Sequence, residues 1–281
     1  MKKQLLDFLK KENIELYGVT DTSRCNVKLA HVLKRAGFAA EEGDEGKQPR
    51  SMLCLCFPYF CAFPKNFSSY ASSPDYHVFC EEFFARLTAL LKELYPQYSF
   101  SGFADRSPYD EVYAASLAGL GGRGDNMLFL TERYSSFVFL GEVVTDMPAE
   151  EWNLPKKEPI SPCIHCGRCK KACPGYKTDE FFCLSALTQK KGELTEDEAK
   201  TIRTYGSAWG CDICQKVCPI TERALKSGSI YTPIEYFKTD RTEKLTRELI
   251  ENMSDEDFKA RAYSWRGKQT VLRNLKILDE E

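Results

Sequence analysis

The sequence predicts a mixed α/β (α+β) fold in its first part and a cysteine-rich module behind it. Over residues 1–150, segments with the helical spacing of apolar residues alternate with short apolar runs, which is typical of a domain built from helices and strands. Two dense cysteine runs follow between residues 163 and 218. The last stretch is charged and has helical periodicity. We therefore expect three domains, over residues 1–150, 151–225 and 226–281.

The elements of the first domain follow from periodicity and from glycine and proline breakers. Helices are expected where large apolar residues recur three or four positions apart, and strands at short apolar runs. The expected helices span residues 1–13, 25–36, 76–94 and 108–117. The expected strands span residues 14–19, 52–57, 98–104, 127–130 and 137–144. Residues 59–74 are irregular and aromatic, and we expect a loop of that length to line a pocket.

Composition excludes several classes of protein. The net charge of −2 and the pI near 6.1 do not indicate a surface that coats nucleic acid. No apolar run approaches the length of a membrane span, and the N-terminus lacks the apolar core of a signal peptide. Thirteen cysteines without an export signal predict a reducing, cytoplasmic location. Five cysteines outside the runs are expected to be mostly small buried hydrophobes: Cys25, Cys54, Cys56, Cys61 and Cys80.

The first cysteine run has the spacing C-x2-C-x2-C-x3-C-P and extends from Cys163 to Pro174. This is the bacterial ferredoxin pattern, in which three thiolates hold one cubane cluster and the fourth reaches a second one. The second run, from Cys211 to Pro219, has one cysteine fewer than the full pattern. His165 lies between cysteines of the first run, and we expect it to adjust hydrogen bonding rather than to bind iron.

The two runs together predict two 4Fe–4S clusters in a ferredoxin-like domain. The first cluster is assigned Cys163, Cys166, Cys169 and Cys218. The second cluster is assigned Cys173, Cys211 and Cys214, with Cys183 as the best candidate for its fourth ligand. Zinc would favour two isolated C-x2-C pairs, and disulfides need an oxidising compartment, so both alternatives explain less of the pattern.

Asp105 is the carboxylate that the sequence singles out. It follows an expected strand and lies near the glycine-rich turn at residues 118–124, where α/β folds place ligands. Partial burial would raise the pKa of this carboxyl and suit it to act as a general acid. The alternative is that Asp105 caps the helix expected from Pro108, and both interpretations stay open. The turn itself is not a dinucleotide fingerprint, because it follows a helix and reads G-x-G-G-x-G.

Motifs spread over most of the chain resemble the epoxyqueuosine reductase family. Both cysteine runs match it, but many ferredoxin-like proteins share those runs. The specific part is the combination with flanking segments: Tyr70-Ala71, Asp75-Tyr76-His77, Asp105, Ala118 to Gly121 with Asn126, Tyr134 to Glu142, Cys183 to Gly192, Ser264 to Lys268, and Arg273-Asn274.

The resemblance implies a cobalamin-dependent iron–sulfur reductase that removes the epoxide oxygen of epoxyqueuosine in tRNA. The first domain would bind cobalamin, and the clusters would pass it electrons from an external donor of the ferredoxin or flavodoxin type. The family's catalytic aspartate falls on Asp105, which would protonate the departing oxygen, and a family cysteine falls on Cys183. The implied cofactor contacts are Tyr70, Ala71, Asp105, Asn126, Tyr134, Ser185 and Gln189.

Three departures from the family pattern bear on the substrate. Asp125 stands where the family usually has a lysine, the region before Met52 is shorter, and the chain ends at Glu281 without the family's HEAT-like repeats that help to hold tRNA. The glycine of the cobalt-ligand motif D-x-H-x-x-G is missing after His77, so we do not expect His77 to ligate cobalt. Two alternatives remain: a related reductase that acts on a small molecule, and an electron-transfer protein with no catalytic site.

Overall fold

The structure is a computed structural model that describes residues 2–41, 43–177 and 182–280. The chain divides into two compact units. The first consists of Met1–Pro58 and His77–His165, and the second of Tyr59–Tyr76 and Cys166–Glu281. Each unit is described by itself. The functional division at residues 150 and 225 stays a prediction.

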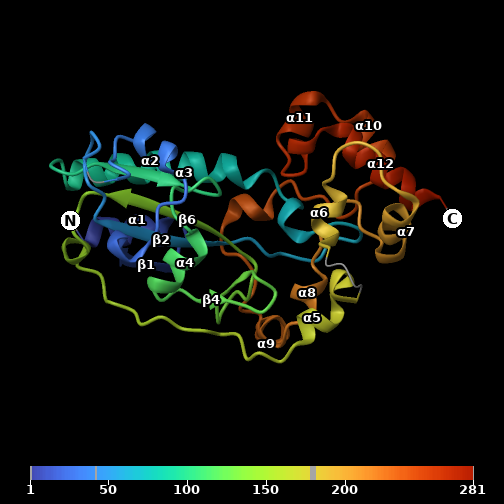
Figure 1. Cartoon of the computed structure of the whole chain (residues 1–281), viewed down its shortest axis with the longest axis horizontal. Coiled ribbons are helices and arrows are strands. Elements are labelled where there is room, and N and C mark those ends of the chain that lie inside the picture. The colour runs from blue at the N-terminus through green and yellow to red at the C-terminus, as the bar shows by residue number, and fades with distance from the viewer. Residues whose placement is uncertain (1, 42, 178–181, 281) are drawn as a thin grey trace. The chain divides into compact units, whose positions relative to one another are not determined.

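The first unit is built on a four-stranded sheet with the strand order β1-β2-β6-β3 (Figure 1). The strands are β1 (Leu16–Asp21), β2 (Ser51–Pro58), β6 (Val138–Thr145) and β3 (Phe100–Phe103). Every pairing is antiparallel. The mixed α/β class is therefore confirmed, in its α+β form. The antiparallel sheet removes one argument made for Asp105, because the rule about carboxyl ends of strands holds for parallel sheets.

The helices of the first unit lie close to their expected positions. The long helix α3 spans Tyr76–Leu94, as predicted, while the others are shorter than expected. These are α1 (Lys2–Lys11), α2 (Ala30–Arg35) and α4 (Glu111–Leu117), with 3-10 turns at Thr22–Arg24 and Ala149–Trp152. Met1, at which the first expected helix begins, lies outside the described residues. A small hairpin of β4 (Gly122–Arg123) and β5 (Phe129–Leu130) was predicted only in its second strand.

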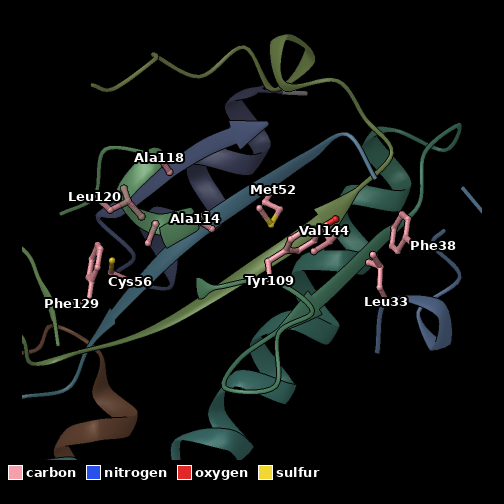
Figure 2. Close-up of a cluster of buried hydrophobic side chains, with 12 residues drawn as sticks. Leu33, Phe38, Met52, Cys56, Tyr109, Ala114, Ala118, Leu120, Phe129 and Val144 are labelled. Atoms are coloured by element: carbon pink, nitrogen blue, oxygen red, sulfur yellow. The ribbon is translucent and has the colours of Figure 1, made fainter. Parts of the chain in front are cut away.

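Side chains alternate between the two faces of β2 and fill two layers of core. One face carries Met52, Cys54 and Cys56 into a buried cluster with α4 (Figure 2). The opposite face carries Phe57, whose ring packs edge-on against Phe83 of α3 at 5.0 Å between centroids. Because β2 is buried along its whole length, its sequence reads as one apolar run rather than as an alternation.

The cysteines outside the runs behave largely as expected. Cys54, Cys56 and Cys80 are buried, and Cys25 and Cys61 are half-buried. Burial raises the pKa of the Cys25 thiol to about 11, so these sulfurs are neutral packing atoms at physiological pH.

The segment over residues 147–162 runs along the first unit as an extended strap. The indole of Trp152 donates a 2.8 Å hydrogen bond to Ser51 Oγ, and Ser51 Oγ donates to the carbonyl of Met147 at 2.6 Å. The glycine-rich turn is packed under this strap rather than free. A Cβ on Gly119, which has φ +71°, would lie 2.4 Å from Lys157 Cβ, so glycine is needed there for close approach.

The second unit is mostly helical, as expected for the end of the chain. Its helices are α5 (Arg168–Ala172), α6 (Leu184–Thr188), α7 (Glu196–Tyr205), α8 (Ile213–Lys216), α9 (Pro219–Ser227), α10 (Arg247–Asn252), α11 (Asp255–Lys259) and α12 (Lys268–Asp279). Short 3-10 turns occur at Ser69–Ala71, Pro174–Lys177, Glu235–Lys238 and Ser264–Arg266. None of the described helices combines the length and the apolar character that crossing a membrane requires.

The core of the second unit surrounds the fully buried side chain of Trp209. Phe67 and Ala71, from the segment before α3, pack in this core with residues of α10, α11 and α12. The amide of Asn274 on α12 donates to the carbonyls of Thr188 and Ala208, at 2.6 and 2.9 Å. Asn274 therefore fixes α12 on the segments that flank the second cysteine run.

We expect Ser51→Ala to destabilise the first unit by about 2–6 kcal/mol. The change leaves both the Trp152 indole N–H and the Met147 carbonyl buried without their partner, at about 1–3 kcal/mol each. Urea unfolding monitored by tryptophan fluorescence measures the loss. Ser23→Ala, at an exposed serine, serves as the control. A loss equal to that of the control would show that these hydrogen bonds contribute nothing to stability.

Candidate cluster ligands and active site

The cysteine runs form short helices, and several of their cysteines lie within these helices or at their ends. Helices α5 and α8 pack against each other and carry Cys169 and Cys214 (Figure 1). Cys173 ends α5, where the following proline starts a 3-10 turn. Cys218 caps α9, and Pro219 occupies its first position, where a missing N–H costs no hydrogen bond. The two Cys-Pro pairs therefore end one helical turn and begin the next.

Three thiols assigned to the second cluster interact with one another. The pKa of the Cys211 thiol is raised to about 11, mainly by burial and also by the neighbouring Asp212, Cys183 and Cys173. Cys214 follows three residues after Cys211. All the cysteines are free thiols. Mutual repulsion among neighbouring thiolates is what bound iron relieves, so this donor set fits a thiolate-ligated cluster.

The first cluster's assigned ligands fall in both units, and only Cys163 belongs to the first unit. There, His165 Nδ1 lies 3.9 Å from Cys163 Sγ and 2.9 Å from Asp125 Oδ1. His165 has a left-handed backbone with φ +53°, and Gly167 follows at φ +70°. The carboxylate of Asp125 thus holds a ring beside a candidate ligand, which agrees with a hydrogen-bonding role for His165.

Asp212 is a buried carboxylate that sequence reasoning missed. It is 4% exposed and accepts hydrogen bonds from the N–H and the hydroxyl of Ser69, at 2.7 and 2.6 Å, and from the hydroxyl of Ser68. Gln215 Nε2 donates to it at 3.0 Å. The irregular segment over residues 59–74 therefore anchors the loop between Cys211 and Cys214. The available signal was Ser68-Ser69, one of two serine pairs in this aromatic-rich loop.

Asp105 stands out in the first unit by its backbone. It has φ +63°, an uncommon conformation for a residue with a side chain, and such strain concentrates at functional sites. Its side chain is 60% exposed, and Oδ2 lies 3.5 Å from His77 Nε2. Its N–H donates to Glu111 Oε1 at 3.0 Å. The Asp105 carboxylate thus faces solvent, while the hydrogen bond from its backbone N–H to Glu111 holds the loop in place.

Two expectations about Asp105 are wrong. The hydrogen bond from His77 lowers the pKa of this carboxyl below its ordinary value, outweighing the opposite effect of burial, so Asp105 is ionised at neutral pH. It is also not the cap of α4. That helix begins at Glu111, and its cap is Asp110, which accepts a hydrogen bond from the N–H of Tyr113 at 3.1 Å.

Two further carboxyl groups are electrostatic neighbours here: Glu111 interacts with Asp105, and Glu142 interacts with Glu111. Burial raises the pKa of Glu111 to about 7. Glu142, in the middle of β6, is 1% exposed and accepts a hydrogen bond from the hydroxyl of Ser107, and burial raises its pKa well above the ordinary value. A glutamate inside the apolar run of β6 was the sequence signal for this cluster.

The expected cofactor contacts of the first unit differ in accessibility. Asn126 lies in the β4–β5 turn, where its Oδ1 accepts a hydrogen bond from the N–H of Leu128 at 3.3 Å. Met127 in the same turn is 61% exposed. Tyr134 is fully buried, and its hydroxyl donates to Glu15 Oε2 at 2.7 Å. Its role toward a cofactor stays a prediction.

The expected contacts of the second unit have partners within the chain. Tyr70 accepts a 2.7 Å hydrogen bond from the indole of Trp209, and Ala71 is fully buried. Gln189 Nε2 donates to both the carbonyl and the hydroxyl of Ser185, each at 3.0 Å. These residues make contacts within the second unit. Contacts from them to a cofactor stay predictions.

Comparison with known proteins agrees with these observations. Residues 162–221 match a family model described as a 4Fe-4S double cluster binding domain. The epoxyqueuosine reductase of Listeria monocytogenes is 34% identical over 216 residues, which is 73% of this chain and 54% of the relative. That of Lactococcus garvieae is 30% identical over 221 residues, or 75% of this chain and 60% of the relative.

Solved structures show the same fold. The structure of epoxyqueuosine reductase from Streptococcus thermophilus superposes with a TM-score of 0.74 at 22% identity, covering 99% of this chain and 80% of that one. A selenomethionine-labelled epoxyqueuosine reductase gives a TM-score of 0.76 at the same identity and coverage.

Fold and cysteine pattern thus define a double-cluster iron–sulfur protein. The resemblance that the motifs predicted is confirmed: the chain is similar to epoxyqueuosine reductases in sequence and in fold. The chain spans little more than half the length of the first curated relatives it matches.

We expect Glu111→Gln to flatten the pH dependence of stability between about pH 4.5 and 7. The folded state keeps Glu111 protonated up to about pH 7, whereas the unfolded chain releases that proton near pH 4.5, so stability falls as pH rises through this window. Thermal midpoints from pH 4.5 to 8 measure the slope. Glu81→Gln, at an exposed glutamate, should leave the slope unchanged. An unaltered slope in Glu111→Gln would contradict the assignment.

We expect Cys183→Ala to lower the iron content of reconstituted protein from about eight to about four per chain, because one cubane loses a ligand. Anaerobic reconstitution with iron and sulfide, followed by iron analysis, measures the change. Cys25→Ala, a half-buried thiol outside both runs, should keep the full content. Full iron in Cys183→Ala would remove Cys183 from the ligand set.

Proposed function

We propose that this chain is an iron–sulfur reductase that uses cobalamin to remove the epoxide oxygen of epoxyqueuosine in tRNA. The observation that carries the proposal is Asp105, a strained and exposed carboxylate paired with His77, in a chain whose cysteines fit two clusters. One related structure holds an epoxyqueuosine-modified tRNA stem loop. Another, from Bacillus subtilis, is described with an aspartate catalytic loop swung out of the active site.

The chemistry sets what the residues must supply. Converting an epoxide to an alkene and water consumes two electrons and two protons. Clusters that change by one electron each can store these electrons one at a time. We assign the first cluster to Cys163, Cys166, Cys169 and Cys218, and the second cluster to Cys173, Cys183, Cys211 and Cys214.

Cobalamin is a flat, apolar macrocycle fringed by amides. The β4–β5 turn fits such a group, because it offers the amide of Asn126 beside the exposed side chains of Met127 and Leu128. When bound and reduced, cobalamin would supply a low-valent cobalt that reacts with the epoxide. The turn is held by Gly124, whose N–H donates to the carbonyl of Leu128 at 2.9 Å.

Asp105 and His77 supply the protons. Asp105 Oδ2 lies 3.5 Å from His77 Nε2, and this interaction lowers the pKa of the Asp105 carboxyl, so the two side chains form an acid–base pair through which a proton can pass. When the carbon–oxygen bonds of the epoxide break, the departing oxygen takes this proton from the pair. A second proton, which reaches the pair from solvent, completes the water molecule.

A small-molecule substrate is the second candidate. Basic residues of the C-terminal segment, where RNA contacts would be sought, are engaged with the chain itself. Arg261 donates to the carbonyl of Asp240 at 2.6 Å, Arg273 to that of Lys190 at 2.8 Å, and Lys268 to that of Met253 at 2.6 Å. Salt-sensitive binding of tRNA would decide against this candidate, since phosphate contacts produce that dependence.

The deciding experiment compares wild type with Asp105→Asn. Reconstituted protein is supplied anaerobically with cobalamin, a chemical reductant and epoxyqueuosine-containing tRNA, and queuosine is measured by mass spectrometry. We expect Asp105→Asn to lose about 10²- to 10⁴-fold in turnover while iron and cobalt contents stay unchanged. Asp7→Asn, at an exposed aspartate of α1, is the matched control.

Two results would overturn the proposal. Wild-type turnover in Asp105→Asn would remove this residue from the chemistry. Full iron without cobalt uptake or turnover in the wild type would leave an electron-transfer protein.

A further inference from the structure

A shallow groove of about 490 Å³ lies beside the cysteine runs of the second unit. Its floor is apolar and is made by Ala172, Val217 and Leu225. Charged side chains form its rim, and they come from three short helices that lie near one another, α5, α8 and α9 (Figure 1). The rim residues are Arg168, Lys171, Lys216 and Glu222.

The three helices carry a local excess of positive charge. Their exposed charged residues are Arg168, Lys170, Lys171, Lys216, Arg223 and Lys226, against the single carboxylate of Glu222. Glu222 is itself paired, with Oε1 at 2.7 Å from Lys226 Nζ and Oε2 at 3.7 Å from Arg168. The whole chain has a net charge of −2, so this surface is opposite in sign to the molecule that carries it.

Two residues that line the groove are next to assigned cluster ligands in the chain. Ala172 precedes Cys173 and Val217 precedes Cys218, and neighbouring Cα atoms are about 3.8 Å apart. Cys173 is assigned to the second cluster and Cys218 to the first. A molecule seated in the groove would therefore lie next to residues that hold both clusters. A solvated helix face, the usual explanation for a basic run, accounts for neither the apolar floor nor this position.

We propose that this groove is the docking surface for a small acidic one-electron carrier protein that reduces the clusters. The proposal rests on the proposed function for its need of electrons. In each encounter the reduced carrier gives up one electron and is oxidised, and one 4Fe–4S cluster passes from the 2+ to the 1+ state. Two encounters supply one turnover. The charge of the rim selects an acidic partner and speeds its arrival, and the apolar floor permits close contact.

The test measures carrier-driven cluster reduction without substrate or cobalamin. Reconstituted protein is mixed anaerobically with reduced flavodoxin, and cluster bleaching is followed by stopped flow. We expect Lys171→Glu with Lys216→Glu to slow this reaction about tenfold or more at low salt and to abolish its decrease with added salt. Photochemical reduction with a neutral deazaflavin should proceed as in wild type.

The matched control reverses two exposed lysines elsewhere in the second unit, Lys200→Glu with Lys259→Glu, and should keep the wild-type rate. If the glutamate variant loses iron, Lys171→Gln with Lys216→Gln replaces it and should give a smaller loss of the same kind.

Three results would overturn the proposal. These are an equal loss in the control, a wild-type rate in the groove variant, and no reduction of wild-type clusters by flavodoxin. If the groove variant instead loses tRNA binding while its clusters are reduced normally, the surface faces RNA and the proposal is wrong. The cluster-reduction assay contains no epoxide, so its result can be interpreted even if the queuosine-forming assay shows no activity.

Discussion

The second unit is held together around one buried carboxyl group, that of Asp212. Burying a carboxylate such as that of Asp212 costs several kcal/mol unless hydrogen bonds replace its water. Three donors from Ser68 and Ser69, and one from Gln215, do so here. The carboxylate thereby joins a segment near residue 68 to the loop that carries Cys211 and Cys214. The positions of these thiols are therefore set by residues some 140 positions earlier in the chain.

In the first unit, differences in burial give neighbouring carboxyl groups different pKa values. Glu142 is buried and holds its proton, Glu111 is half-buried with its pKa raised to about 7, and Asp105 is exposed and ionised beside His77. Glu111 nonetheless positions Asp105, because it accepts the N–H of that strained residue. Glu111 thus supports the loop, and the Asp105–His77 pair is left to exchange protons with a molecule bound at the site.

Periodicity was a good guide where local signals determine structure. The helix at residues 76–94 and the strand through Met52 were predicted because their apolar spacing is unambiguous. The cysteine pattern likewise predicted the double-cluster module, since ligand spacing is local. The pKa of Asp105 was mispredicted because its partner, His77, lies 28 positions away in the sequence and a strand-end rule for parallel sheets was applied to an antiparallel one. Strand β4 was missed because its glycine, Gly122, has low strand propensity and is needed for close approach to the carbonyl of Ile160 in the strap.

The division of the chain has a consequence for synthesis on the ribosome. Residues 59–76 emerge early, yet Phe67 and Ala71 belong to a core completed by Trp209 and α12. The first unit has all of its own residues once position 165 has been made. The segment over residues 59–76 therefore lacks its packing partners in the nascent protein until Trp209 and α12 have been synthesised. Strand β2 and helix α3 flank this segment, so once the first unit has folded they can hold its two ends and close it into a loop.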